Sequence, residues 1–320
     1  MKKVFLTRKI PKDPLEELQK ICDLEFNKLD RNLTQDEIIK QAKDCDVLFC
    51  LLSDKIDKRV IDALPNLKGI VNYAVGYNNI DIEYATEKNI AVTNTPGVLT
   101  ETTADLAWAL IFSIARRVVE ADKFTRSGKF VGWAPELLLG GDIFGKTLGI
   151  IGAGRIGKAV AKRASGFGMK VLYTSRSSKI SQENCERVEL DFLLENSDFV
   201  SLHVPLTNET KHLITKREFE IMKPTAYLIN TARGAVVKES DLLEALRTKQ
   251  IAGAGLDVYE KEPRLIEGLT ELSNVVLLPH VGSGTLETRS AMGFICVRNI
   301  QAILDGELPP DLVNKDLKAD

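Results

Sequence analysis

Three side chains with the chemistry of a catalytic group each follow a separate predicted strand. In chain order they are Arg233, Glu262 and His280. Ligands bind at the carboxyl ends of strands in open α/β sheets, so we expect the three to share one site. An imidazole beside a carboxylate can act as a general acid, and a planar guanidinium can bind a carboxylate and polarise a carbonyl. Taken one at a time, the three could equally be a surface arginine, a loop acid and a turn histidine. Their placement at three strand ends together is what indicates catalysis.

A glycine-rich turn within the segment KTLGIIGAGRIG, residues 146–157, predicts what binds beside this group. It joins an apolar strand to the start of a helix, the context in which G-x-G-x-x-G binds a dinucleotide. Gly152 allows a tight exit from the strand, Gly154 lets the backbone approach a pyrophosphate, and Gly157 lets the helix pack close to the sheet. The pyrophosphate would then lie on free N–H groups at the helix N-terminus.

The end of the next strand predicts which dinucleotide binds. In NAD-binding folds an acid about 20 residues past the last glycine binds the ribose hydroxyls and repels a 2′-phosphate. Ser175 occupies that place here, followed by Arg176, Ser177, Ser178 and Lys179. A guanidinium flanked by hydroxyls favours a dianionic phosphate, so NADP(H) is predicted over NAD(H), with NAD(H) as the second choice. The alternative is that Arg176 is an ordinary solvated arginine of a turn.

The hydrophobic pattern divides the chain into two α/β units. Residues 1 to about 95 alternate between short strands and helices, and the stretch from about 149 to 279 repeats the alternation with six predicted strands. We therefore predict an α/β fold of two Rossmann-like, doubly wound parallel sheets with a cleft between them. The flavodoxin-like substrate domain is assigned residues 1–98 and 287–320, and the dinucleotide-binding domain residues 99–286.

Two helical patterns connect these units. One continuous helix is predicted from about 101 to 127 and is expected to bridge the units. Its apolar side is formed by Leu106, Leu110, Ile114 and Val118. A final helix, about 286–304, is expected to return to the first unit, so that both ends of the chain build that unit.

Composition excludes several other classes of protein. The chain has 320 residues, of which 44% are hydrophobic, enough for two cores. Its 43 basic and 45 acidic residues provide no basic field for nucleic acid or a membrane surface. Five cysteines without a C-x-x-C pair argue against a disulfide framework and a zinc site. No stretch reaches the ~18 apolar residues of a membrane span, so a cytoplasmic protein is predicted.

Taken together, the motifs resemble the D-isomer-specific 2-hydroxyacid dehydrogenase family over nearly the full length. NTARG, DVYEKEP and LPHVGS match that family's Arg, Glu and His signatures in order and approximate spacing. The NYAVGYNNID loop and the DIFGKTLGIIGAGRIG turn also match. TPGVLTETTADLA and a GW-x-P element containing Gly132 and Trp133 resemble the glyoxylate/hydroxypyruvate reductase branch in particular.

The resemblance implies NADPH-dependent reduction of a small 2-oxo acid, glyoxylate or hydroxypyruvate. It assigns His280 as the general acid paired with Glu262, Arg233 as the residue that binds and polarises the substrate, and no metal. The N–H groups around Val75 and Gly76 resemble the family's second carboxylate cradle. Cofactor contacts carried over by position are Thr103, Gly152, Gly154, Arg155, Ile156, Gly157, Ser175, Arg176, Ser177, Val204, Pro205, Thr231, Ala232 and Asp257.

Three of the remaining assignments have a second interpretation. Asp257 could bind the nicotinamide amide or cap the following turn. Trp133 is either a core plug or, as in relatives of the reductase branch, a residue that reaches the substrate across a homodimer interface. His203 is a structural residue that could touch cofactor, whereas His212 is expected to be an exposed loop or helix residue.

Other functions remain open at this stage. Within the family they are 2-ketogluconate reductase, phosphoglycerate dehydrogenase and D-lactate dehydrogenase; the last two commonly prefer NAD, and the missing ribose acid argues against them. From another class, the same fold serves in dinucleotide-sensing corepressors. A sensor does not need an intact set of Arg233, Glu262 and His280, which favours an enzyme.

Overall fold

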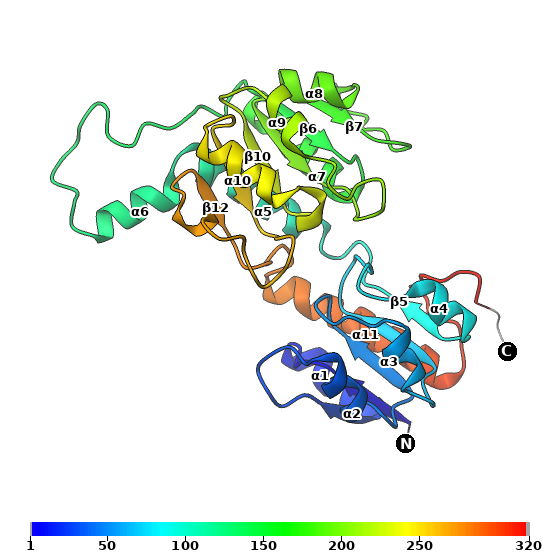
Figure 1. The fold of residues 1–320 in the computed structure, drawn as a ribbon. Coiled ribbons are helices and arrows are strands. Elements are labelled where there is room, and N and C mark those ends of the chain that lie inside the picture. Colours follow the sequence, from blue (N-terminus) through cyan, green and yellow to red (C-terminus); the bar gives the residue numbers. More distant parts are fainter. Residues whose placement is uncertain (1, 318–320) are drawn as a thin grey trace. The chain divides into compact units, whose positions relative to one another are not determined.

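The computed structural model describes residues 2–317 and divides the chain into two compact units (Figure 1). Unit 1 contains the chain up to Leu99 and from Ser283 onward, and unit 2 is Thr100–Gly282. The second boundary therefore lies ahead of the predicted 286/287. Each unit is built on one all-parallel sheet, which confirms the predicted fold class.

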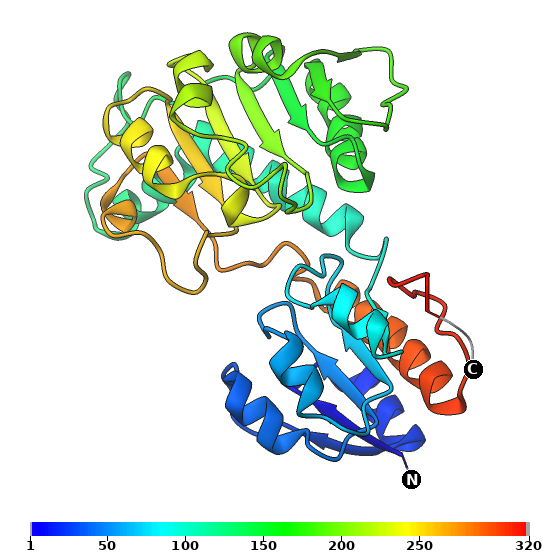
Figure 2. The same cartoon turned by 45° about the vertical axis from the view of Figure 1, so that its right-hand side comes forward.

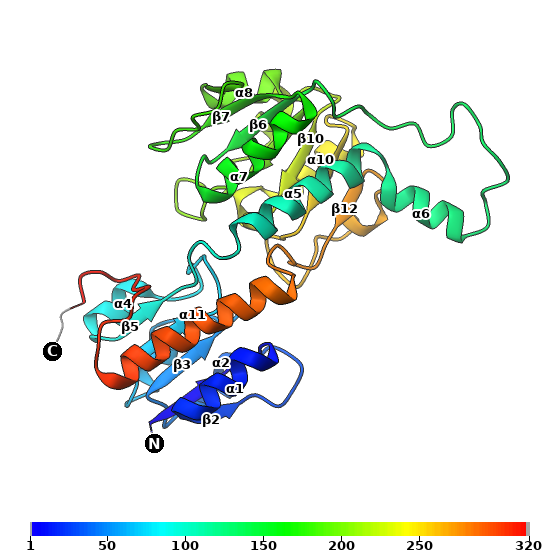
Figure 3. The same ribbon diagram turned by 180° about the vertical axis from the view of Figure 1, so that it is seen from behind.

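Unit 1 has five strands in the order β2-β1-β3-β4-β5, the flavodoxin-like order. Helices α1 and α11 cover one face of this sheet, and α2, α3 and α4 cover the other (Figures 1 and 3). The elements are β1 (Lys3–Leu6), α1 (Lys12–Ile21), β2 (Asp23–Phe26), α2 (Gln35–Gln41), β3 (Val47–Cys50), α3 (Lys58–Asp62), β4 (Gly69–Asn72), α4 (Ile82–Glu87), β5 (Ala91–Thr93) and α11 (Leu286–Asp305).

Burial on both faces explains why the central strands read as continuous apolar runs. All four residues of β3, VLFC, are buried, and successive side chains enter the two opposite cores. After α11 the chain returns to the edge of the sheet, where Leu312 forms a bridge with Thr93 (Figure 2). Both ends of the chain therefore contribute to unit 1.

Unit 2 has seven strands in the order β12-β11-β10-β9-β6-β7-β8. In chain order this is the dinucleotide-binding order 3-2-1-4-5-6 with one further strand, and the order reverses between β6 and β9. Its strands are β6 (Thr147–Ile151), β7 (Lys170–Thr174), β8 (Cys185–Arg187), β9 (Phe199–Leu202), β10 (Tyr227–Asn230), β11 (Gly253–Leu256) and β12 (Val275–Leu277).

Helices cover both faces of this sheet as well. Helices α5 and α7 pack on one face, and α8, α9 and α10 on the other (Figures 1 and 3). The helices of unit 2 are α5 (Thr100–Ala115), α6 (Val118–Arg126), α7 (Arg155–Ala164), α8 (Leu190–Asn196), α9 (Lys216–Ile221) and α10 (Glu239–Arg247), with short 3₁₀ turns at Ser165–Phe167, Gly234–Val236 and Leu269–Glu271. No helix among the described residues is both long and apolar enough to cross a membrane.

The prediction of one continuous helix from 101 to 127 is wrong. The chain breaks between α5 and α6, where Arg117 adopts a left-handed φ of 52°. The end of α5 is capped from elsewhere in the chain, because Gly141 N–H donates to the carbonyl of Ala115 at 2.8 Å. Ile114 is buried but Val118 is 49% exposed. The apolar spacing continues past the end of α5, so it does not show where that helix ends.

The six strands predicted for the second unit omitted β8. This strand is only three residues long, Cys185–Arg187, and two of its side chains are exposed. It lies at the edge of the sheet, paired only with β7 among the described strands. A short polar edge strand has no hydrophobic alternation, so a pattern of apolar residues could not reveal it.

Helix α6 and the segment after it extend away from the sheet of unit 2 (Figures 1 and 3). No residue of α6 is buried. We call α6 and residues 127–144 the arm. Its large exposed apolar side chains are Val118, Val119, Phe130, Val131, Trp133, Leu137, Leu139 and Phe144. Trp133 is 85% exposed, so it is not a plug of the core in this structure.

Candidate active site

His280 and Glu262 form a hydrogen-bonded pair at the carboxyl edge of the sheet in unit 2. His280 Nδ1 lies 2.7 Å from Glu262 Oε2. The other carboxylate oxygen, Oε1, accepts from the N–H of Tyr259 at 3.0 Å. The carboxylate is therefore fixed from both sides, and it holds the imidazole with Nε2 as the nitrogen left to exchange a proton.

The backbone of His280 adopts a conformation that non-glycine residues rarely occupy. Its φ is 55°, in the left-handed region. Asp257 holds this conformation, because its carbonyl accepts from His280 N–H at 2.9 Å and its Oδ1 accepts from Val281 N–H at 2.7 Å. These two hydrogen bonds hold the strained backbone of His280 in place.

Arg233 joins this pair from the end of β10. Burial lowers the pKa of its guanidinium while the charge of Glu262 raises it, so these two groups lie close enough to interact. Asn230 fixes the backbone here, since its side chain donates to the carbonyl of Arg233 at 3.0 Å and accepts from Ala232 N–H at 3.0 Å. At the next residue, a Cβ on Gly234 would lie 1.8 Å from the carbonyl carbon of Tyr259. This close packing brings the two strand ends together.

Glu262 is held in its charged form. Burial opposes ionisation, but the hydrogen bond and charge of His280, the N–H of Tyr259 and the charge of Arg233 together lower the pKa of Glu262 below its usual value. The ionised carboxylate therefore stays hydrogen-bonded to Nδ1 of His280 and fixes the orientation of the ring.

The glycine turn has the geometry that its sequence predicts. Gly152 has a φ of 101°, and a Cβ there would lie 2.6 Å from the carbonyl oxygen of His203. A Cβ on Gly157 would lie 2.0 Å from the carbonyl oxygen of Gly152. Around Gly154, in contrast, a Cβ would meet nothing within 4 Å. The protein itself therefore needs Gly152 and Gly157, whereas the space beside Gly154 is open to a ligand.

Helix α7 begins directly after Gly154, so Arg155 and Ile156 are its first residues. No side chain caps this helix end, which leaves its first N–H groups for an anion. Val204 and Pro205 follow β9, the strand on the other side of the point where the strand order reverses. These four predicted contacts therefore lie where the fold binds a dinucleotide.

Two buried polar atoms near the catalytic pair lack partners among the described residues, namely Asp257 Oδ2 and Thr231 Oγ1. A Cβ on Gly282 would lie 3.3 Å from Asp257 Oδ2 and 3.5 Å from Thr103 Oγ1. An orphaned buried carboxylate oxygen is costly unless something pairs with it. A carboxamide donor such as that of nicotinamide fits this requirement, so the residues present suit a nicotinamide dinucleotide.

The predicted ribose end lies directly after β7. Arg176 and Ser177 are exposed and Ser175 is half-buried. The hydroxyl of Thr207, which donates to Glu209, and the charge of Arg176 both lower the pKa of Glu209. A carboxylate therefore stands near Arg176, although not in the strand-end position that would bind ribose hydroxyls.

The loop after β4 in unit 1 presents consecutive backbone N–H groups. The carbonyls of Ala74, Val75 and Gly76 accept hydrogen bonds from Thr95 N–H at 2.9 Å, Asn94 Nδ2 at 2.7 Å and Asn72 Nδ2 at 2.9 Å. In a trans peptide the next N–H points opposite to the carbonyl. The N–H groups of Val75, Gly76 and Tyr77 thus face away from these donors, as a carboxylate cradle requires.

The two other histidines have structural surroundings. Burial lowers the pKa of His203 to about 3, and its Nε2 lies 2.8 Å from the hydroxyl of Ser201. His203 is therefore neutral near pH 7 and cannot supply a proton there. His212, expected to be exposed, is instead half-buried and lies 2.8 Å from Glu260.

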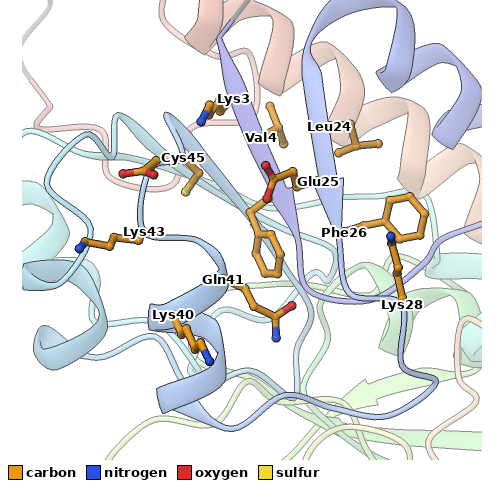
Figure 4. Close-up of a pocket in the computed structure, with 12 residues that line it drawn as sticks. Lys3, Val4, Leu24, Glu25, Phe26, Lys28, Lys40, Gln41, Lys43 and Cys45 are labelled. Atoms are coloured by element: carbon orange, nitrogen blue, oxygen red, sulfur yellow. The ribbon is translucent and has the colours of Figure 1, made fainter.

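A hollow of about 570 Å³ on unit 1 contains none of the predicted site residues (Figure 4). Its charged lining consists of Lys3, Glu25, Lys28, Lys40, Lys43 and Asp44. All six are exposed groups of mixed sign, which is ordinary for a solvated surface. We assign no chemistry to it. Residues 2–317 also contain no group of three or more His, Cys, Asp or Glu placed to hold a metal ion.

Comparison with known proteins agrees with this site. The family described as "D-isomer specific 2-hydroxyacid dehydrogenase, NAD binding domain" matches residues 108–282. This range contains the glycine turn and all three of Arg233, Glu262 and His280. The chain therefore belongs to the D-isomer-specific 2-hydroxyacid dehydrogenase family and is an NAD(P)-dependent oxidoreductase, which confirms the resemblance drawn from the motifs.

Within this family, several similar relatives are glyoxylate reductases. That of Thermococcus litoralis is 51% identical, covering 98% of this chain and 97% of its own, and that of Korarchaeum cryptofilum is also 51% identical. A solved structure of an NADPH-dependent glyoxylate/hydroxypyruvate reductase from Sinorhizobium meliloti, in complex with NADP and malonate, has a TM-score of 0.87 at 31% identity. It covers 99% of this chain and 97% of its own. The placement on the glyoxylate reductase branch is confirmed.

Proposed function

We propose that this protein reduces small 2-oxo acids with NADPH, converting glyoxylate to glycolate and hydroxypyruvate to D-glycerate. The observation that carries the proposal is the His280–Glu262 pair beside Arg233, at the carboxyl edge of a sheet whose glycine turn suits a dinucleotide. The relatives named glyoxylate reductase support the choice of substrate.

Each side chain then has a distinct task. Reduced nicotinamide, when bound, supplies the hydride that reaches the carbonyl carbon. His280 donates the proton from Nε2 to the carbonyl oxygen, and Glu262 holds the ring through its hydrogen bond to Nδ1. Arg233 binds the substrate carboxylate and polarises the carbonyl. The N–H groups of Val75 and Gly76, in unit 1, are a second group suited to binding a carboxylate.

For the cofactor, we propose that Asp257 Oδ2 accepts from the nicotinamide amide and that Thr103, Thr231 and Ala232 line the same end. Gly152, Gly154, Arg155, Ile156, Gly157, Val204 and Pro205 would hold the pyrophosphate. Ser175, Arg176 and Ser177 would hold the 2′-phosphate. Because no acid opposes the 2′-phosphate at the strand end, NADP(H) is preferred.

Arg176→Ala should raise the KM for NADPH far more than the KM for NADH, and equal effects on the two KM values would refute the preference for NADP(H).

We further propose that the protein acts in the cytoplasm as a homodimer, with the arm as the contact between copies. A contiguous exposed apolar segment of this kind marks an interaction surface. Trp133 on the arm then lies at the interface, where it could reach the partner's substrate. The small 2-oxo acid is the expected partner otherwise, with no nucleic acid or membrane.

The experiment that tests the activity is a set of initial rates with NADPH and NADH against glyoxylate, hydroxypyruvate, pyruvate and 2-ketogluconate. Fast NADPH oxidation with the two- and three-carbon acids glyoxylate and hydroxypyruvate supports the proposal. A preference for 2-ketogluconate would assign the protein to another reductase of the same family. Absence of turnover with every acid, from folded protein that binds dinucleotide, would favour a sensor.

A further inference from the structure

A second arginine contacts the turn that follows β7. Arg187, the last residue of β8, lies opposite Tyr173 in the parallel register, close to the carboxyl end of β7. Its Nη2 donates to the carbonyl oxygens of Ser175 and of Arg176, the latter at 3.2 Å. The Arg187 side chain therefore fixes two successive peptide groups of this turn.

This anchoring determines where the N–H groups of the turn point. In a planar trans peptide, the N–H of one residue points opposite to the carbonyl of the residue before it. Because the carbonyls of Ser175 and Arg176 face Arg187, the N–H groups of Arg176 and Ser177 face away from it. Neither N–H donates a backbone hydrogen bond within residues 2–317. Successive free N–H groups of this kind form an anion-binding nest.

The nest coincides with the groups already assigned to the 2′-phosphate. Ser178 N–H donates to the hydroxyl of Ser175 at 3.3 Å, which further closes the turn, while Arg176 and Ser177 remain exposed. The Arg187 side chain is exposed as well, so its charge adds to that of Arg176 at the same turn. Both carbonyls accept from one nitrogen, Nη2, whose two N–H bonds have fixed directions in the guanidinium plane.

We propose that Arg187 is a positioning residue that sets the preference for NADP(H), by holding the turn Ser175–Ser177 in the conformation that receives a 2′-phosphate. This inference rests on the proposed use of NADPH, and it adds a residue outside the glycine turn and outside the strand-end position that normally governs the choice of dinucleotide.

The test compares Arg187→Ala and Arg187→Lys with the unchanged protein. For each, KM and kcat are measured with NADPH and with NADH at saturating glyoxylate, and binding of adenosine 2′,5′-bisphosphate and of 5′-AMP is measured by calorimetry. For Arg187→Ala we expect the KM for NADPH to rise about tenfold, equivalent to about 1.4 kcal/mol. The KM for NADH, kcat and 5′-AMP binding should change little. Arg187→Lys should restore part of the loss, because its ammonium keeps the charge but lacks the fixed donor directions of the guanidinium.

The neighbouring residue provides a matched control. Glu186 lies on the same strand with its side chain on the opposite face and pairs with Lys170 at 2.8 Å. Glu186→Gln should leave the ratio of the two KM values unchanged. If the unchanged protein prefers NADPH, the inference is overturned when Arg187→Ala raises the KM for both cofactors equally. It is also overturned when Arg187→Ala raises neither KM. If the unchanged protein itself prefers NADH, the proposed cofactor is wrong, and that result is visible before any variant is made.

Discussion

At the scale of single residues, His280 has a strained backbone and a side chain that is hydrogen-bonded to Glu262. A left-handed backbone costs a non-glycine residue about 1–2 kcal/mol. Asp257 offsets this cost with two hydrogen bonds, and Glu262 fixes the ring that results. His280 is thus held in a position that a relaxed chain would not adopt, as expected for a proton donor that must meet a substrate.

Replacing this histidine should remove proton donation without removing the fold. His280→Asn keeps a residue type that tolerates left-handed φ, and we expect kcat for glyoxylate reduction to fall about 10²- to 10⁴-fold. The matched control is His212→Asn, because His212 also has a left-handed φ, 53°, and also pairs with a glutamate. Initial rates together with thermal melting measure both variants. Similar kcat losses in the two would show that His280 is not the acid.

The pH profile tests the role of Glu262. The pKa of Glu262 is lowered in the folded protein, so the carboxylate remains ionised as the pH falls toward that lowered pKa. Its contribution is therefore present above the usual glutamate pKa and is lost only on further acidification. Glu262→Gln removes the charge at every pH, so we expect kcat/KM for glyoxylate reduction to be lower at every pH and the fall in kcat/KM that comes from protonating Glu262 to be absent. An unchanged pH profile would show that the Glu262 carboxylate does not contribute to catalysis.

At the scale of elements, the turn between β6 and α7 contains two glycines that the fold requires and one, Gly154, that we propose faces a ligand. A methyl group on Gly157 would collide with the carbonyl of Gly152, so Gly157→Ala should destabilise unit 2 by about 1–3 kcal/mol. A methyl group on Gly154 meets no protein atom within 4 Å, so Gly154→Ala should melt normally. It should nevertheless raise the KM for NADPH about tenfold, or about 1.4 kcal/mol. Thermal melting and initial rates separate the two effects. Normal cofactor affinity in Gly154→Ala would mean that no pyrophosphate approaches this position.

Elements with strong hydrophobic patterns could be predicted from the sequence, and those shaped by distant contacts could not. The central strands were found because burial on both faces makes them almost entirely apolar. The break at Arg117 was missed because Gly141, distant in sequence, caps the end of α5. Strand β8 was missed because its exposed residues carry no such pattern, and with it the contact of Arg187 to the turn after β7.

The site shows the same limit. Placement at strand ends was enough to propose Arg233, Glu262 and His280 as one site, since strand ends can be predicted from local sequence. Their pairing required the left-handed His280, the N–H of Tyr259 and the close contact at Gly234, none of which leaves a local signal. Likewise, the loop containing Val75 was found by resemblance, but the side chains of Asn72 and Asn94 that orient it were not.

At the scale of the whole molecule, the arm is the feature that one copy of the chain does not explain. Val131 is 97% exposed and Trp133 is 85% exposed, so neither contributes to the core of unit 2. Apolar side chains gathered on an extended segment are stabilised when a second copy covers them, and twofold pairing is the commonest way to do so. The arm therefore makes a prediction about assembly that the two sheets alone do not.

Placing a charge on the arm should prevent assembly and leave the fold intact. Val131→Asp puts a carboxylate where the proposed interface is apolar, and the desolvation of that charge opposes pairing. We expect light scattering to report a dimer for the unchanged protein and a monomer for the variant, with the same circular dichroism spectrum, since an exposed substitution changes folding by only about 0.5 kcal/mol. Lys129→Asp is the control, because it lies on the same segment but replaces an exposed charged residue. If the unchanged protein is monomeric, or if the Val131→Asp variant remains dimeric, the arm has a role other than pairing two copies.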